Sequence, residues 1–90
     1  MNKAELIHQI ALSADISKAA AERALDATVG NIRRTLKKGG VVTLVGFGSF
    51  SIKKRKARTG RNPRTGATLK IKAANVPHFK PGKGLRDALN

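Results

Sequence analysis

The segment 53–70 constrains the fold of this chain more than any other part of the sequence. Apart from one proline, its only apolar residues are Ala57, Ala67 and Leu69. A segment this poor in apolar side chains cannot bury enough surface to offset the conformational entropy lost when it becomes ordered. We therefore predict that it projects into solvent as an extended ribbon and does not join a core.

The same half of the chain carries most of the net positive charge. Residues 46–90 contain twelve basic side chains and one acidic one, whereas residues 1–45 contain seven basic and four acidic side chains. The formal net charge is +14 for 90 residues. Charge of one sign repels itself in a compact protein, so a polyanion is the natural partner. The alternative is a solvated, solubilising surface, but such surfaces usually mix both signs.

Amphipathic periodicity predicts two helices in the first forty residues. Apolar side chains recur at helical spacing over 3–14, and Asn2 precedes that segment as a capping residue. After a short turn, Ser17 caps a second, alanine-rich helix that begins at Lys18 and ends before Gly39. Two helices with so short a connection form an antiparallel or crossed hairpin.

The remaining sequence follows a β pattern. The predicted elements are a strand over 41–45, a turn or bulge over 46–48, a second strand from Ser49, a third strand over 68–73, an irregular segment over 77–82 and a short helix over 83–89. The predicted fold class is α+β: a two-helix hairpin, a three-stranded antiparallel sheet with a long protruding β-ribbon arm, and a short C-terminal helix. We interpret residues 1–90 as one domain.

A chain of this length needs help to be stable. About 60% of the unfolded surface is buried in a domain this small, which leaves a marginal core. The chain has no cysteine for a disulfide, and His8 and His78 are far apart without acidic or thiol neighbours, so neither a structural metal nor a cofactor is expected. Oligomerisation is the expected source of the missing stability.

No membrane segment is expected. No apolar run approaches the roughly 20 residues that span a bilayer. The N-terminus begins an amphipathic pattern at once, without the apolar stretch of a signal peptide. We therefore expect a soluble, intracellular chain with no membrane partner, and the lack of cysteine fits a reducing cytoplasm.

The arm carries the residues that we expect to bind. Four arginines recur at intervals of three residues, at Arg55, Arg58, Arg61 and Arg64, and Pro63 stands between the last two. The planar guanidinium binds phosphate bidentately and enters a narrow minor groove at lower desolvation cost than lysine. A rigid proline at the tip of a ribbon can wedge between base pairs. The alternative for Pro63 is an ordinary turn proline.

The aromatic content argues against single-stranded or RNA ligands. Proteins that bind single strands stack bases on exposed aromatic rings. This chain has no Tyr or Trp, and Phe47, Phe50 and Phe79 lie among Gly, Val, Leu and Ile, which favours a role in core packing. An RNA-binding or ribosome-associated basic protein remains the rival of a different class.

An enzyme is not expected. The five acidic residues are scattered over helices, where solvated charge is the ordinary interpretation, and His8 is expected at a helix surface. No acid/base pair, nucleophile–histidine pair or metal cluster is present. We expect neither a catalytic site nor a small-molecule substrate.

Two motifs resemble one known family. Gly46-Phe47-Gly48-Ser49-Phe50 and Arg61-Asn62-Pro63-Arg64-Thr65-Gly66 are similar to the signature of the bacterial HU and integration-host-factor family. The resemblance continues over the whole chain, including the ending Gly82–Asn90, and is nearer to the β-type HU chains. An integration-host-factor-type, sequence-preferring DNA bender is the alternative within that family.

The resemblance implies an intertwined dimer whose two arms reach around the minor groove of double-stranded DNA, with Pro63 intercalating at a kink. It implies a helical dimerisation half with the first strand over 1–45 and a DNA-binding arm over 53–74, called the arm below. The implied dimer-core residues are Leu36, Leu44, Phe47, Phe50 and Phe79. The implied DNA-binding residues are Lys3, Lys53, Arg55, Arg58, Arg61, Asn62, Pro63, Arg64, Thr65, Lys70, Lys72, Lys80 and Lys83.

The same resemblance implies partners and location. Bent, nicked or gapped DNA is the expected ligand, bound with little sequence dependence to compact and stabilise a bacterial nucleoid in the cytoplasm. The expected assembly is a homodimer, with a heterodimer containing a second HU chain left open. In some HU proteins residues matching Lys3 and Asp26 pair on the dimer flank, and both are present here.

Overall fold

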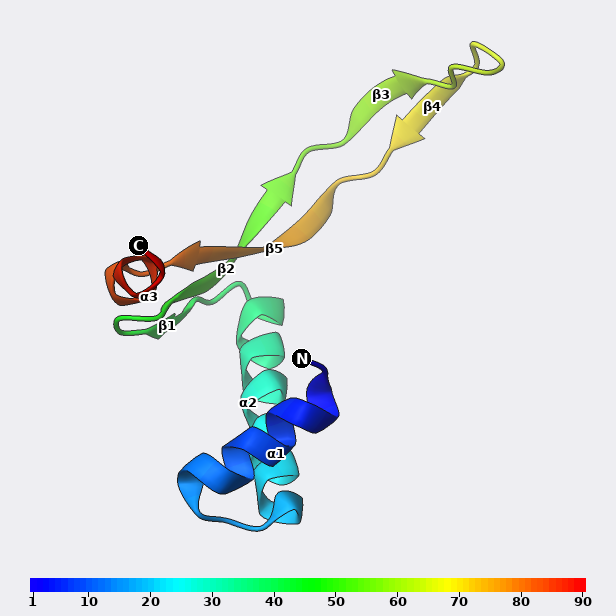
Figure 1. The fold of residues 1–90 in the computed structure, drawn as a ribbon. Coiled ribbons are helices and arrows are strands. Elements are labelled where there is room, and N and C mark those ends of the chain that lie inside the picture. The colour runs from blue at the N-terminus through cyan, green and yellow to red at the C-terminus, as the bar shows by residue number, and fades with distance from the viewer. The chain divides into compact units, whose positions relative to one another are not determined.

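The computed structural model describes residues 1–90 and contains three helices and five strands (Figure 1). In chain order these are α1 (Lys3–Ala14), α2 (Lys18–Lys37), β1 (Val42–Leu44), β2 (Gly48–Arg55), β3 (Arg58–Arg61), β4 (Thr68–Ile71), β5 (Ala74–Pro81) and α3 (Lys83–Leu89). The chain divides into two compact units, residues 1–34 and 35–90, which are described separately. None of the helices is long and apolar enough to cross a membrane.

The first unit contains α1 and most of α2, joined by a short turn. The Asn2 side chain accepts a hydrogen bond from the Glu5 backbone N–H at 2.9 Å, and the Ser17 hydroxyl accepts one from the Ala20 N–H at 3.1 Å. These bonds satisfy backbone donors that a helix start leaves unpaired. Asp15 ends α1 in the left-handed conformation, with φ 55°. The predicted two-helix hairpin and both caps are confirmed.

Very little of either unit is buried. The buried hydrophobic side chains are two alanines, Ala11 on α1 and Ala21 on α2, and no large side chain is fully buried. Apolar side chains as large as Leu12 and Val29 remain exposed on the helices. A chain with this burial has not completed its hydrophobic core, because large apolar side chains supply most of the favourable free energy of folding.

The second unit is built on a three-stranded antiparallel sheet in the order β1-β2-β5. β2 pairs with β5 along its whole length, from Gly48 opposite Pro81 to Arg55 opposite Ala74. The third strand of the sheet is therefore β5, and the prediction of an irregular segment over 77–82 was wrong. Prolines lack the N–H that a ladder needs, yet an edge strand tolerates them because one of its sides has no partner.

The segment predicted as the third strand, 68–73, instead supplies β4, which pairs with β3 in a separate two-stranded sheet. Arg58 lies opposite Ile71 and Arg61 opposite Thr68. This register continues that of β2 and β5 without a shift, since two residues on each side separate the paired segments. The two sheets are therefore parts of one long hairpin that forms the arm at its far end (Figure 1).

Alternation along the strands gives the three-stranded sheet one apolar and one polar face. The apolar face contains Val42, Leu44, Phe50, Ile52, Pro77 and Phe79. The Phe79 ring lies 5.6 Å from that of Phe47 and 4.9 Å from that of Phe50. Gly48 lies beneath this cluster, where a Cβ atom would stand 2.6 Å from the Phe79 ring. The absence of a side chain at Gly48 therefore allows the aromatic cluster to form.

The C-terminal helix α3 holds the turn between β1 and β2. The Leu85 N–H donates to the Gly46 carbonyl at 2.9 Å, and the Gly82 N–H donates to the Phe47 carbonyl at 2.8 Å. A Cβ atom on Gly84 would lie 2.6 Å from the Gly46 oxygen, so only glycine permits this close approach. The predicted C-terminal helix is confirmed, and its role is to fix the turn that presents Phe47.

Candidate nucleic-acid interface

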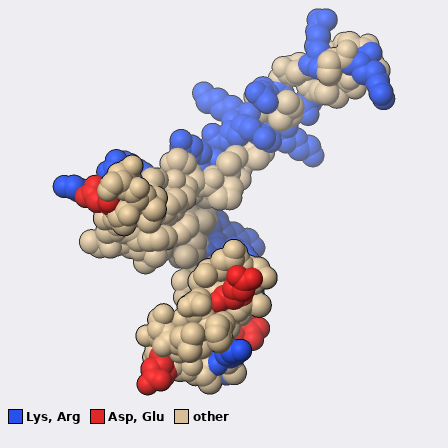
Figure 2. Space-filling model, in the orientation of Figure 1, with Lys and Arg blue, Asp and Glu red and all other residues tan.

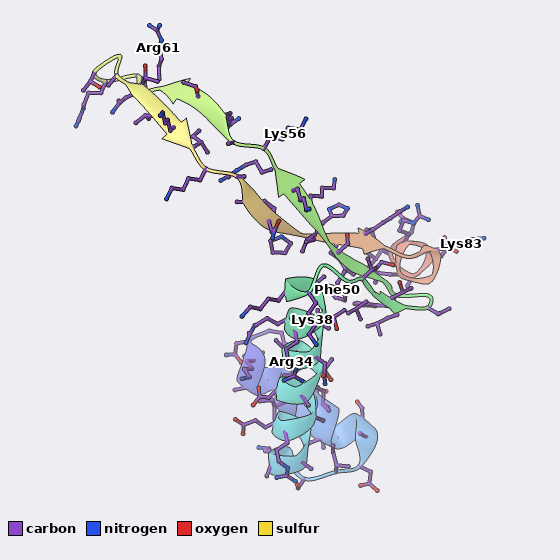
Figure 3. All side chains as sticks on the ribbon, turned by 180° about the vertical axis from the view of Figure 1, so that it is seen from behind. Arg34, Lys38, Phe50, Lys56, Arg61 and Lys83 are labelled. Atoms are coloured by element: carbon purple, nitrogen blue, oxygen red, sulfur yellow. The ribbon has the colours of Figure 1, made fainter.

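The arm presents a dense, unpaired positive charge. Its basic residues are Lys53, Lys54, Arg55, Lys56, Arg58, Arg61, Arg64, Lys70 and Lys72, and all are exposed. Lys and Arg atoms cover much of the arm in Figure 2, and no acidic residue lies on it. Figure 3 shows Lys56 and Arg61 extending away from the arm. The structure's single ion pair lies elsewhere, between Lys3 and Asp26, so these charges are available to an external anion.

The tip of the arm is an ordered turn that presents Pro63. The Asn62 N–H donates to the Ala67 carbonyl at 2.8 Å, and the Gly66 N–H donates to the Asn62 carbonyl at 2.7 Å. The Asn62 side-chain oxygen accepts from the Arg64 N–H at 2.8 Å, which is an Asx turn. Gly66 has φ +70°, a conformation that glycine adopts without strain. The Pro63 ring is exposed at the end of this turn.

Two predicted groove-lining residues thus have a structural role. The side-chain oxygens of Asn62 and Thr65 both accept hydrogen bonds from backbone N–H groups of the tip, the latter from Ala67 at 3.3 Å. These bonds shape the turn around Pro63. The Asn62 side-chain NH₂ can still donate to a ligand, because its oxygen is the atom engaged.

The arginines of the arm do not share one face. Arg58 lies on the face of Ile71 and Leu69, whereas Arg61 lies on the opposite face with Thr68 and Lys70, because residues three apart in a strand point in opposite directions. Spacing by three therefore distributes guanidinium groups over both faces. An arm with this arrangement suits a groove that has phosphates on both walls.

Predicted binding residues on the sheet and on α3 lie near the base of the arm. Lys53 and Lys80 share the polar face of the sheet, and Lys83 begins α3. Lys80 also lines a shallow depression of about 260 Å³ with Thr43, Ser49 and Arg86. The hydroxyl oxygens of Thr43 and Ser49 are 3.3 Å apart. Hydroxyls beside two cations form a surface able to receive an anion.

The other residues of this surface were not predicted from the sequence. They are Thr43, Ser49, Ser51, His78 and Arg86. The alternation of Ser49 and Ser51 with Phe50 and Ile52 is a signal of a strand with one polar face. That signal could not be used fully, because the partner strand β5 had been predicted as irregular.

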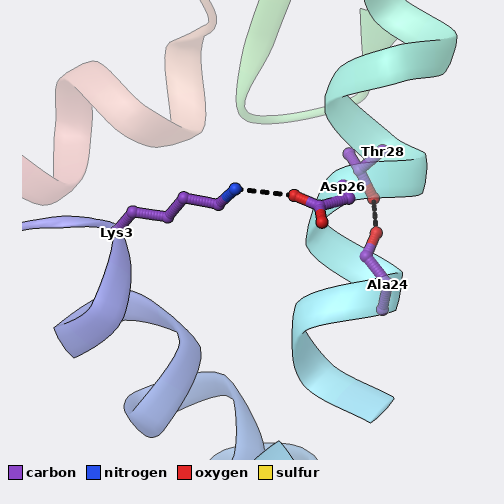
Figure 4. Close-up of polar contacts among 4 residues, drawn as sticks. All are labelled: Lys3, Ala24, Asp26 and Thr28. Carbon is purple, nitrogen blue, oxygen red and sulfur yellow. Dashed lines mark hydrogen bonds and ion pairs between the residues drawn. The ribbon is translucent and has the colours of Figure 1, made fainter. Parts of the chain in front are cut away.

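Lys3 lies in the first unit and is held by an acidic partner. Its Nζ atom is 2.8 Å from Asp26 Oδ1 (Figure 4). The hydrogen bond to Asp26 and its negative charge raise the pKa of the Lys3 ammonium above its ordinary value. The expected pairing of Lys3 with Asp26 is therefore present. The other predicted DNA-binding residues all lie in the second unit.

The predicted core residues are brought together only in part. Phe47, Phe50 and Phe79 form one aromatic cluster, yet Phe47 is 46% exposed and Phe79 36% exposed. Leu44 lies on the same apolar face and is 43% exposed, and Leu36 on α2 is half-buried. The cluster is thus formed within one chain but is left uncovered by that chain.

Comparison with known proteins gives a consistent result. The family described as bacterial DNA-binding protein matches residues 1–90. The chain is 59% identical to DNA-binding protein HU-beta of Salmonella typhimurium and of Escherichia coli, and 60% identical to that of Pseudomonas aeruginosa. Each match extends over 90 residues and covers 100% of both chains.

Solved structures resemble the whole fold. The HU chain of an Anabaena HU–DNA cocrystal structure superposes with a TM-score of 0.90 at 44% identity, covering 99% of this chain and 97% of that one. HU from Thermotoga maritima superposes with a TM-score of 0.73 at 33% identity, covering 100% of both chains. The elements, the aromatic cluster, the basic arm and these full-length matches agree, and the chain belongs to the HU family of bacterial DNA-binding proteins.

Proposed function

We propose that this chain is a histone-like protein that binds and bends double-stranded DNA with little dependence on base sequence. The observation that carries the proposal is the arm: a paired ribbon with cations on both faces, no acid and an exposed proline at its tip. The relatives named DNA-binding protein HU-beta and the similarity to an HU chain crystallised with DNA support it.

The binding energy comes chiefly from phosphates. Two copies of the chain carry a formal charge of +28, twice the +14 of one copy. Each phosphate neutralised by Lys or Arg releases condensed counterions, so the affinity falls as salt rises. If six to ten phosphates are neutralised, the slope of log affinity against log salt is about −5 to −9. The arms lie in the minor groove, where guanidinium groups on both faces of each arm reach both walls.

Bending is assigned to the tip. Insertion of Pro63 between base pairs costs a few kcal/mol of stacking, which extra protein–DNA contact on the bent duplex offsets. DNA that is already bent, nicked or gapped needs less of this deformation energy, so it binds more tightly. The tip bonds from Asn62 support this role, since they hold the turn in shape before DNA arrives.

The working unit is an intertwined homodimer. The only hydrophobic side chains that one chain buries are two alanines, and it leaves its apolar sheet face and Phe79 partly uncovered. A second copy covers these surfaces. In a dimer with twofold symmetry, both chains use the same patch to form the interface. A heterodimer with another HU chain would use the same face. We assign the dimer to the bacterial nucleoid in the cytoplasm, where it compacts and stabilises DNA.

The test is a pair of titrations at two salt concentrations, on a short intact duplex and on the same duplex with a nick. We expect tighter, salt-sensitive binding to the nicked DNA, and the same affinities when the base sequence is scrambled. A strong preference for one base sequence would favour an integration-host-factor-type bender. Equal binding to nicked DNA, intact DNA and duplex RNA would contradict bending and leave a generic basic protein.

A further inference from the structure

The polar face of the three-stranded sheet is a cationic surface with a histidine at its centre. It contains Thr43, Ser49, Ser51, Lys53, Arg55, His78 and Lys80, because these residues alternate with the apolar set on the same strands, and Ala74 and Val76 lie on it at the end nearer the arm. Phe50 and Phe79 point to the other face, which the protein must cover to complete its core. The polar face is therefore the one that remains open to an external ligand.

His78 occupies the middle of this face on β5. It lies directly opposite Ser51 on β2 and is half-buried. Lys80 follows two residues later on the same strand, and Lys53 is the diagonal neighbour on β2. The depression beside Lys80 adds Thr43 and Ser49 from the neighbouring strands and Arg86 from α3. His78 thus lies between two groups of cations.

No carboxylate lies on this face of the strands. Besides His78, the titratable and charged groups on the face are Lys53 and Arg55 on β2 and Lys80 on β5, with Arg86 at the edge on α3. Asp87, the single acidic residue of 46–90, does not line the depression. A DNA phosphate drawn to these cations would be the only anion on the face. It would favour the protonated imidazole by charge attraction and by accepting its N–H.

We propose that His78 is a proton-linked phosphate ligand, so that DNA binding takes up protons and tightens as the pH falls from 7 to 5.5. This inference rests on the proposed DNA-binding function and adds a residue and a pH dependence to it. Imidazole is the side chain whose charge ordinarily changes in this pH range. By linkage, a ligand that favours the protonated form binds more tightly where that form is more populated.

The chain offers a matched control, because His8 is its only other histidine. It lies on α1, in the other unit, and is exposed. The experiment measures the affinity for one nicked duplex at pH 7.0 and at pH 5.5, at constant salt, for the wild type, His78→Ser and His8→Gln. Keeping the pH at or below 7.0 limits the contribution of the terminal amine, which titrates near about 7.7–8.0.

We expect the wild type and His8→Gln to bind about fourfold more tightly at pH 5.5 than at pH 7.0, which corresponds to a favourable shift of about half a pK unit at each of two histidines. His78→Ser should lose this tightening. Calorimetry at pH 6.5 in two buffers of different ionisation enthalpy should detect proton uptake for the first two proteins and none for His78→Ser.

A second variant separates charge from folding. His78→Lys carries a permanent charge, so it should bind at pH 7.0 about as tightly as the wild type does at pH 5.5, without pH dependence. Retention of the wild-type pH dependence by His78→Ser, or its absence from the wild type, would overturn the inference while leaving DNA binding intact. Absence of salt-sensitive DNA binding from every variant at both pH values would instead contradict the proposed function itself.

Discussion

The apolar face of the sheet and the arm are both exposed, but for opposite physical reasons. Phe79 and Leu44 on the sheet are more than a third exposed although their surfaces are apolar, whereas the arm exposes nine cations without an acid. Exposed apolar surface lowers its free energy by meeting more protein. Exposed charge of one sign lowers its free energy by meeting a polyanion. The exposure of a surface therefore does not by itself identify the partner of that surface. The chemistry of the exposed side chains does.

This difference in surface chemistry also determines which property of the protein each region controls. The sheet face should control the stability of the protein and its assembly, with little direct effect on a ligand. The arm should control DNA affinity with little effect on stability, since its side chains make few contacts within the chain. Substitutions confined to one region test this division.

Substitution of Phe79 by alanine should have the largest effect. The ring contacts Phe47 and Phe50 within one chain, and the proposed dimer covers the rest of it. Removing a buried phenylalanine costs about 3–5 kcal/mol, a large part of a typical stability of about 5–15 kcal/mol. Urea unfolding at several protein concentrations measures the decrease together with the monomer–dimer equilibrium.

The control for this substitution is Val45→Ala, since Val45 is 98% exposed in the chain. It should change the free energy of unfolding by no more than about 0.5 kcal/mol. If Phe79→Ala were as mild as this control, and the wild-type stability did not depend on protein concentration, the sheet face would not be a subunit interface.

Replacing both Arg58 and Arg61 by alanine should have the next largest effect. Binding to every DNA should weaken about tenfold or more, and the salt slope should flatten by about one for each phosphate that the variant no longer neutralises. The melting temperature should stay unchanged, because both side chains are exposed. Fluorescence anisotropy over a salt series measures affinity and slope, and Arg23→Ala on α2 is the control. A decrease in the stability of the double variant would show that the arm also contributes to stability, contrary to the division of roles between the two regions.

Pro63→Ala should have a smaller and more selective effect. Without the wedge, the preference for nicked over intact duplex should fall several-fold, while binding to intact duplex changes less. Competition titrations measure the preference, and energy transfer between labelled DNA ends measures the bend. Pro81→Ala, at the C-terminal end of β5 and away from the tip, should leave both unchanged. An unaltered bend in Pro63→Ala would reduce Pro63 to a turn residue.

Asp26→Asn should have the smallest effect. The Lys3–Asp26 pair is more than half exposed, so solvent screens it. Because Asp26 raises the pKa of Lys3, any stability from the pair is present below the ordinary lysine value of 10.5 and is lost as the pH rises through the higher folded-state value. A small difference in melting temperature at pH 7 should shrink as the pH rises above the ordinary lysine value of 10.5, and it should also shrink at high salt. A difference that persists in both conditions would point to packing instead of charge.

Local signals in the sequence predicted the helices well. The Asn2 and Ser17 caps act within three residues, so the sequence alone located both helix starts, and the predicted first helix has the observed bounds Lys3–Ala14. The arm was also predictable, because a lack of apolar residues is a local property. Its use as a DNA-binding surface stays a prediction.

The non-local features escaped prediction. Pairing of Ile52 with Pro77 joins residues far apart in sequence, and prolines at 77 and 81 argued against a strand. Once β5 was taken as irregular, His78 could not be placed on the polar face of the sheet. Arg58 and Arg61 likewise lie on opposite faces of the arm because of how β3 pairs with β4. The spacing of the arginines in the sequence did not reveal that pairing.

The unbroken register of the long hairpin has a mechanical consequence. Strand pairing stops at residues 56–57 and 72–73, yet equal numbers of residues on both sides keep the strands in step. One bond from the Arg55 guanidinium to the Lys72 carbonyl, at 3.4 Å, crosses the interruption. A bend there changes the direction in which the arm points without changing its reach or the residues at its tip. A hairpin that bends there would keep the length of the arm while changing its angle, and in the proposed function this would let one protein fit DNA curved to different degrees.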